Sequence, residues 1–229
     1  MKILSVPPAE TGEPPAGTVA QGLRIGVPYA MASFLLGLSF GVLARPVLGA
    51  VATIVMSVIV FAGSAQFAAL AVLSAGGGAL PAIIAGSLLN LRFIPMGIAI
   101  AASLDHRAVA RAMRGQALVD ASWALANRGD GSFDIPLLLG STLAQYPAWV
   151  LGTIAGVLAG GVITDPGALG LDAIFPAFFL ALLAIELQRP GARLVCALAV
   201  VITFALIPVA PPGVPIIAAA LAALAGLRR

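Results

Sequence analysis

The stretch Ala79–Leu104 constrains the fold more than any other part of the chain, because Arg92 is the only charged residue among its 26 residues. A helix rises about 1.5 Å per residue, so this stretch is longer than the roughly 30 Å hydrocarbon core of a bilayer. Soluble proteins, in which about a quarter of the residues are charged, rarely contain such a run. The stretch therefore predicts a membrane-spanning helix.

The rest of the chain has the same character. Of its 229 residues, 61% are hydrophobic and only 9% are charged. The second and third apolar segments exceed the roughly 20 residues that one crossing needs, so both are expected to be broken or kinked. We expect an all-α, polytopic membrane helix bundle of about seven spans, which are Pro28–Ala44, Val47–Ala75, Ala79–Leu104, Ile135–Leu158, Leu171–Leu187, Leu194–Val209 and Val214–Leu227.

Two parts of the chain lie outside the expected spans. Residues 1–24 contain four prolines and no apolar core of a signal peptide, so they are expected to form a disordered lead-in to a single transmembrane domain over residues 25–229. Residues 105–133 form a polar loop. Within it, Gln116–Asn127 is either an amphipathic helix in the membrane interface or a helical connector lying on the bundle.

The distribution of basic residues predicts the orientation, since cytoplasmic loops are rich in lysine and arginine. If every segment crosses once, nine arginines lie on one side, and only Lys2 and Arg24 lie on the other. This places the C-terminus and residues 105–133 in the cytoplasm and the N-terminus outside. If instead the second segment consists of two half-helices that return to one side, the N-terminus is also inside and the later loops do not change sides.

Two segments resemble each other. Both Phe34–Ala44 and Trp149–Ala159 read aromatic, two apolar residues, Gly, three residues, Gly-Val-Leu-Ala. They belong to the first and fourth spans, so a repeat of three spans would have inverted topology, as in many secondary transporters. Alternatively, glycines four residues apart are simply common where membrane helices pack. A 3+3 inverted repeat is therefore a possibility that the sequence leaves open.

Arg92 is the first candidate for a functional residue. An arginine near the middle of a span costs about 2.5–3.5 kcal/mol on insertion-based scales, so it is expected to face protein, water or a ligand. Asn90 and Pro95 flank it, and the proline favours a kink. A guanidinium has the planar fork that suits a carboxylate. The alternative is an arginine that reaches the interface or caps a helix end.

The motif Phe61-Ala-Gly-Ser-Ala-Gln-Phe67, in the middle of the second segment, is the second candidate. Gly63 and Ser64 weaken helix continuity, and Gln66 is an amide at membrane depth. A half-helix beginning near Ser64 would direct free N–H groups at the membrane centre, which suits an anion. The alternative is a packing site of small residues, with Gln66 bonded to another helix.

These two motifs are expected to form one site. The glycines at 76–78 predict a tight turn between the second and third segments, and both motifs lie roughly 15–20 Å from that turn. We therefore expect Ser64, Gln66, Asn90 and Arg92 to line one cavity beside Gly63. Asp172 and Glu186, at the ends of the fifth segment, are not deep enough to neutralise Arg92 unless helices bring Glu186 inward. The lack of a deep counter-ion favours an anionic ligand group.

Catalysis and cofactor binding are not expected. The chain has one histidine and one cysteine, so it lacks the ligands of a typical transition-metal site. It contains no nucleophile elbow, no phosphate-binding glycine loop and no HExxH motif. The net charge of +3 is too small and too dispersed to suggest nucleic acid. A protein that is not an enzyme and needs no cofactor fits this pattern.

The chain resembles the AzlC-type branched-chain amino-acid permeases of bacteria. The residues that carry the resemblance begin with Phe61–Phe67 and the Asn90-Leu-Arg92 triplet. They continue with Leu118–Leu125, in which Ala121 stands where the family commonly has an acidic residue, and end with Trp149–Thr153 and Leu169–Phe179. The resemblance runs from about residue 23 to the C-terminus.

The resemblance implies a secondary transporter that exports branched-chain amino acids across the bacterial inner membrane, together with a small AzlD-type membrane subunit. An aliphatic amino acid fits the residues, since its carboxylate suits Arg92 or a helix N-terminus and its side chain suits an apolar wall. The alternative is a channel or a structural membrane subunit that does not transport.

Overall fold

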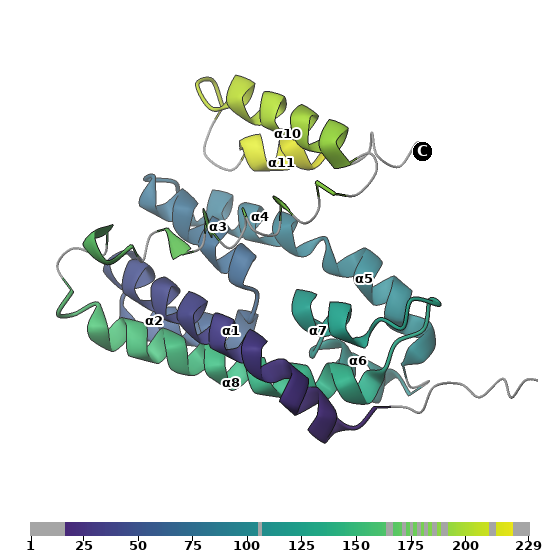
Figure 1. The fold of residues 1–229 in the computed structure, drawn as a ribbon. Coiled ribbons are helices and arrows are strands. Elements are labelled where there is room, and N and C mark those ends of the chain that lie inside the picture. Colours follow the sequence, from purple (N-terminus) through teal and green to yellow (C-terminus); the bar gives the residue numbers. More distant parts are fainter. Residues whose placement is uncertain are drawn as a thin grey trace, which may run out of the picture.

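The structure, a computed structural model, describes residues 17–104, 107–163, 167–170, 192–210 and 214–221, with scattered positions between 173 and 188. Most of the predicted fifth segment, including Asp172 and Glu186, lies outside the described residues. Within the described residues the regular elements are all helices, as expected for an all-α fold (Figure 1). Residues 19–24 already belong to the first helix, so this helix begins earlier than the expected domain boundary at residue 25.

Ten α-helices are defined, together with short 3₁₀ turns at Ala101–Ser103 and Gly167–Leu169, within the described part of the chain. They are α1 (Val19–Leu48), α2 (Ala50–Val60), α3 (Gly63–Ser74), α4 (Ala79–Asn90), α5 (Phe93–Ile100), α6 (Ala108–Gly115), α7 (Asp120–Ala126), α8 (Ile135–Ala159), α10 (Ala192–Leu206) and α11 (Val214–Leu221). Three helical stretches are long and apolar enough to cross a membrane: Val19–Leu48, Ala79–Ser103 and Ile135–Ala159. A multi-spanning helical membrane protein is thus supported, whereas seven spans are not confirmed.

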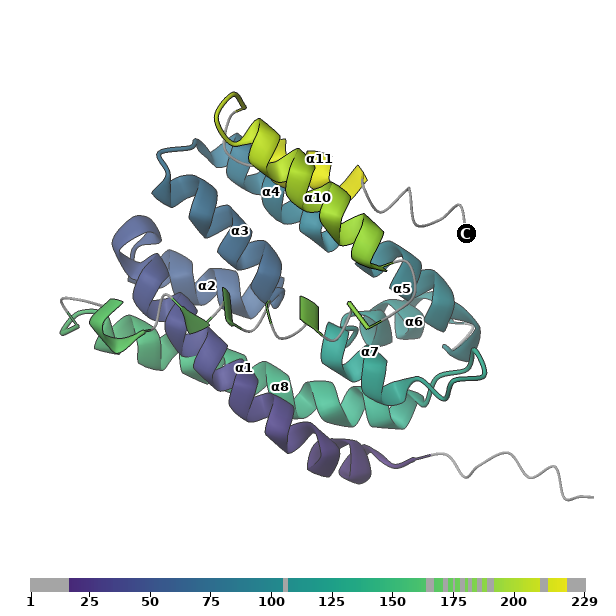
Figure 2. The ribbon, with the colours of Figure 1, turned by 45° about the horizontal axis from the view of Figure 1, so that its top comes forward.

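Helices α1 and α8 pack along their whole length, almost backbone to backbone (Figures 1 and 2). Glycines make this approach possible. A Cβ atom added at Gly41 would collide with the carbonyl oxygen of Thr153, and one added at Gly156 would collide with the carbonyl oxygen of Leu38. Small residues of this kind let membrane helices come close and gain van der Waals contact without a hydrophobic driving force.

The two helices run parallel. Gly22, near the start of α1, faces Gly140 near the start of α8, and Arg45, near the end of α1, donates a hydrogen bond to the carbonyl oxygen of Val157 near the end of α8 (2.5 Å). The two similar segments at 34–44 and 149–159 therefore lie side by side and point the same way. The possible inverted repeat is not confirmed, because an inverted repeat would make these two helices antiparallel.

Helices α2 and α3 form a hairpin rather than one crossing. Ser57 and Gln66 lie on opposite sides of the break at Phe61 and Ala62, yet the Gln66 amide donates a hydrogen bond to the Ser57 hydroxyl (3.0 Å). In a continuous helix these two residues would be about 13 Å apart. Leu70 of α3 then packs near Ala44 of α1, so the chain returns to the end of the bundle where α2 began (Figure 2).

This hairpin corrects the expectation that the second segment crosses once. Each of its helices has 11 or 12 residues, about half the length that a bilayer core requires. Both ends of the hairpin lie at the same end of the bundle. The start of α1 accordingly lies at the same end as the start of α8, where Gly17 N–H donates to the Asp134 carboxylate (2.6 Å). Of the two topologies derived from the sequence, the one with two half-helices fits the structure.

Helices α3 and α4 pack antiparallel, as expected from the turn at residues 76–78. Ala68 and Val72 of α3 contact Ala82 and Ala85 of α4, and all four side chains are buried. Helix α4 ends at Asn90, and α5 continues its course after a short turn (Figure 1). The third segment is therefore interrupted near its middle, as predicted, although the backbone at the turn keeps helical dihedral angles.

The connection between α5 and α8 folds onto the bundle. Trp123 of α7 contacts Phe133, with ring centroids 5.3 Å apart, and Ser122 and Ala126 are buried. Thr142 of α8 donates a hydrogen bond to the carbonyl oxygen of Ala117 (2.6 Å). Residues Gln116–Asn127 therefore pack on the bundle, as the helical-connector alternative describes.

A buried carboxylate fixes the start of α8. Asp134 caps the helix by accepting from Leu137 N–H (3.2 Å), and it also accepts from Gly17 N–H and the Arg128 guanidinium (2.9 Å). Burial alone would raise the pKa of Asp134, but these hydrogen bonds and the Arg128 charge outweigh it, so the pKa lies below its ordinary value. One ionised side chain thus connects three chain segments.

A substitution at Gly156 tests the glycine contact. Gly156→Leu should separate α1 from α8 and lower the free energy of unfolding by about 1–3 kcal/mol or more, as overpacking does. Gly97→Leu is the matched control, because a Cβ at Gly97 meets no atom within 4 Å. Thermal unfolding of the detergent-purified protein would measure both. Equal midpoints for the two variants would contradict the close contact.

A substitution at Asp134 tests the buried charge. Asp134→Asn keeps a capping side chain but removes the charge facing Arg128, so the protein should lose about 1–2 kcal/mol of stability at neutral pH. Because the folded pKa lies below the unfolded value near 3.8, the carboxylate stabilises the fold above that value. The contribution is lost as the pH falls through the folded pKa. The difference in unfolding midpoint between the two proteins should therefore shrink in acid, and a pH-independent difference would contradict this account.

Candidate functional site

The break between α2 and α3 is built on a strained residue. Phe61 has φ 39° and ψ 48°, the left-handed conformation, and it is the only non-glycine residue with positive φ among the described residues. Such a conformation costs of order 1–3 kcal/mol and persists only where surrounding contacts impose it. The Phe61 ring packs edge-on against Tyr146 of α8, with centroids 4.9 Å apart. The Tyr146 hydroxyl donates to the carbonyl oxygen of Val58 (2.9 Å), at the exposed last turn of α2.

Helix α3 begins directly after this break, at Gly63, and no side chain caps it. The first N–H groups of a helix have no acceptor within the helix, and its N-terminus carries a partial positive charge. A Cβ at Gly63 would lie 2.9 Å from the Trp149 ring, so only glycine lets α3 start this close to α8. The break therefore places an uncapped helix N-terminus inside the bundle.

The Arg92 guanidinium lies beside this N-terminus. Its Nη1 donates to the Ser64 hydroxyl (2.6 Å), and the guanidinium stacks over the Phe93 ring at 4.9 Å. Nε and Nη2 donate to the two carboxylate oxygens of Asp120, at 2.9 and 2.7 Å. Arg92 thus faces protein groups, as expected for an arginine within a span, and it lies next to Ser64 as predicted.

Asp120 is the residue that the sequence did not place at this site. The expectation that Arg92 lacks an internal counter-ion is wrong, because α7 folds back and brings the Asp120 carboxylate to the guanidinium. Sequence analysis assigned Asp120 to a loop at the membrane surface. The apolar residues beside it, Leu118 and Trp123, were the available signal that this loop docks on the bundle.

The other two predicted residues occupy different positions. Gln66 is fully buried and turns toward α2, where its bond to Ser57 joins a second bond between Ser57 and Thr153 of α8 (2.9 Å). This matches the alternative in which Gln66 bonds to another helix. Asn90 lies at the end of α4, and its buried Oδ1 atom has no hydrogen-bond partner among the described residues.

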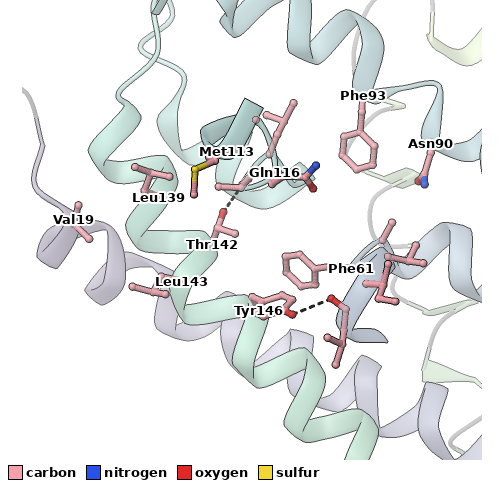
Figure 3. A pocket seen from close by; sticks show the side chains of 17 residues that line it. Val19, Phe61, Asn90, Phe93, Met113, Gln116, Leu139, Thr142, Leu143 and Tyr146 are labelled. Carbon is pink, nitrogen blue, oxygen red and sulfur yellow. Dashed lines mark hydrogen bonds between the residues drawn. The ribbon is translucent and has the colours of Figure 1, made fainter. Parts of the chain in front are cut away.

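A cavity of about 750 Å³ lies next to these groups (Figure 3). Its volume is within the range of small-molecule pockets, roughly 300–1,000 Å³. Phe61 and Tyr146 line one side, and Phe93 and Asn90 line another, as Figure 3 shows. Of the four residues predicted to share a cavity, only Asn90 is among the residues that line it. Arg92 lies between two of the lining residues in sequence, Asn90 and Phe93, though it does not itself line the cavity.

The site combines two chemical features. Arg92 and the uncapped start of α3 supply hydrogen-bond donors of the kind that bind a carboxylate, and one carboxylate, that of Asp120, already pairs with Arg92. The cavity beside them has a wall of aromatic and aliphatic side chains. Among the described residues, no three His, Cys, Asp or Glu side chains gather as metal ligands. The arrangement is suited to binding a small molecule that has an anionic end and an apolar body.

Comparison with known proteins places the chain in a family. A family model described as AzlC protein matches residues 28–163, more than half of the chain and all of the site described above. An uncharacterized membrane protein of Archaeoglobus fulgidus is 36% identical over 145 residues, which cover 62% of this chain and 63% of that protein. The chain therefore spans just under two thirds of this archaeal relative. The inner membrane protein YgaZ of Escherichia coli is 27% identical over 224 residues, covering 89% of each protein.

No solved structure shows a significant match. The helices that form the site, from most of α1 through α8, fall within the family match. With its long apolar helices, the chain is a membrane protein that belongs to the AzlC family.

Proposed function

We propose that the protein is a secondary transporter that exports branched-chain amino acids across the bacterial inner membrane. The observation that carries the proposal is the position of the Arg92 guanidinium, at the uncapped start of α3 and beside an apolar cavity. Intramembrane charges generally mark substrate or ion pathways. A helix broken at membrane depth is tolerated where it is covered by protein or lines a cavity, and transporters use such breaks to bind substrates.

In the proposed site, the amino-acid carboxylate binds to Arg92 and to the N–H groups that begin α3. Arginine gives a bidentate contact that lysine cannot reproduce. The aliphatic side chain lies against the wall formed by Phe61, Phe93 and Tyr146. The unpartnered Oδ1 atom of Asn90 is an acceptor suited to the substrate ammonium group, since an ammonium offers three donors and no acceptor.

The assembly and orientation are part of the same proposal. We propose a small AzlD-type membrane subunit as partner, as the family resemblance implies. The end of the bundle that holds α6, α7 and Asp134 is placed in the cytoplasm, because the arginines of residues 107–128 gather there. With this orientation the N-terminus of α1 also lies on the cytoplasmic side.

Substitution of Arg92 tests the carboxylate contact. Inverted membrane vesicles that contain the protein and its small partner should take up radiolabelled leucine. Arg92→Ala should reduce this uptake at least about tenfold, and Arg92→Lys should restore little of it, because the bidentate fork is lost. Arg24→Ala, at an exposed position on α1, is the control and should transport normally.

Uptake that is absent even in wild-type vesicles would instead favour a channel or a structural subunit. Normal leucine uptake by Arg92→Ala would contradict the proposed site while leaving transport intact.

A second prediction concerns the start of α3. Gly63→Leu should reduce leucine uptake strongly, because its side chain would collide with the Trp149 ring and displace the uncapped N-terminus. Ala71→Leu, on an exposed position of the same helix, should have little effect. The two variants should be compared at equal amounts of inserted protein, measured by immunoblot. Similar uptake by both would show that the close approach at Gly63 does not matter for transport.

A further inference from the structure

The contact between Arg92 and Asp120 has the geometry that a substrate carboxylate would use. Both oxygens of one carboxylate accept from Nε and Nη2 of one guanidinium, at 2.9 and 2.7 Å. This is the bidentate pairing that makes arginine a specific ligand for carboxylates. The remaining nitrogen, Nη1, donates to the Ser64 hydroxyl. The edge of the guanidinium formed by Nε and Nη2 is therefore occupied by Asp120, and Nη1 is engaged by Ser64.

We propose that Asp120 is an internal substitute for the substrate carboxylate, so that Asp120 and substrate occupy Arg92 alternately. The inference rests on the proposed function, because it assumes that a carboxylate ligand binds to Arg92. Compared with the proposed function, it adds Asp120 to the site and an order of binding events. The ligand carboxylate displaces Asp120 on binding, and Asp120 returns when the ligand leaves.

The surroundings of Asp120 permit this exchange. Its side chain is 59% exposed, whereas that of Arg92 is 31% exposed, so the carboxylate can leave without breaking a packed core. Asp120 is the first residue of α7, a helix of seven residues. The chain just before it, from Gly115 to Leu118, lines the cavity. A ligand in the cavity therefore contacts the segment that carries Asp120.

The exchange has a consequence for transport. When no substrate is bound, an unpaired Arg92 would be a net charge within the bundle. A conformational change that carries this charge through the membrane would cost free energy. Pairing with Asp120 neutralises that charge, so the empty protein can change conformation. Removal of the Asp120 carboxylate should therefore slow the conformational change by which the empty protein returns to the state that binds substrate. Net export requires this step. Exchange of substrate for substrate, in which Arg92 is always paired, should persist.

Binding measurements test the competition directly. The full chain is purified with its partner, and leucine binding is measured by calorimetry for wild type, Asp120→Asn and Asp120→Glu. Loss of the competing carboxylate should tighten leucine binding by about threefold to fivefold, the order expected for an exposed ion pair. Asp120→Glu should restore competition. Asp130→Asn, at an exposed aspartate of the same connection, is the control and should match wild type.

Leucinamide, which lacks a carboxylate, separates competition from general damage. Its affinity should be equal in wild type and in Asp120→Asn. If wild type binds leucine and Asp120→Asn binds it equally or less tightly, the inference is overturned while the proposed function stands. If neither wild type nor any variant binds leucine, the proposed function and the inference are both overturned.

Two further measurements do not depend on the binding affinity of a variant. In vesicles, Asp120→Asn should lose most net leucine efflux but retain leucine–leucine exchange, and an equal loss of both would overturn the inference. In the wild-type protein, saturating leucine should speed amide hydrogen exchange in α7. Unchanged or slower exchange there would also overturn it.

Discussion

The backbone contact between α1 and α8 is the interaction on which the other elements depend. Two parallel helices with glycines at their interface give a rigid pair, and the hairpin of α2 and α3 rests on it. Contacts with α8 fix the hairpin, among them the hydrogen bond between Ser57 and Thr153, the hydrogen bond from Tyr146 to Val58, and the packing of Trp149 against Gly63. Because α8 supplies all three, the break in the second segment has a defined position. The uncapped start of α3 is placed by the same helix.

The site follows from that placement and from one long-range ion pair. The hairpin brings Ser64 to the bend between α4 and α5, where Arg92 lies. The connection before α8 then brings Asp120 to the same guanidinium. The Arg92 charge, which costs free energy to place in a membrane, is in this way surrounded by the Ser64 hydroxyl, the Asp120 carboxylate and the Phe93 ring. Three segments far apart in sequence thus meet at one guanidinium.

Local signals in the sequence predicted much of this fold. Apolar runs predicted the helices, and Gly63 and Ser64 predicted the break. The glycines of the turn at residues 76–78 predicted the antiparallel packing of α3 on α4. Whether a broken segment crosses or returns could not be predicted, because hydropathy is the same for both paths. The hydrogen bond from Gln66 to Ser57 shows that the segment returns, and that bond exists only in the folded chain. Asp120 was missed for a similar reason: a surface loop has no periodic pattern that shows where it docks.

The glycine interface also limits how this molecule can move. At this interface, carbonyl oxygens of each helix lie against glycines of the other, so sliding or rotation would bring backbone atoms into collision. Helices α1 and α8 are therefore expected to move together as one unit. The contacts between α3 and α4 involve alanine side chains instead, and α7 is short and partly exposed. In the proposed transporter, alternating access would then move α4, α5 and α7 against the pair formed by α1 and α8.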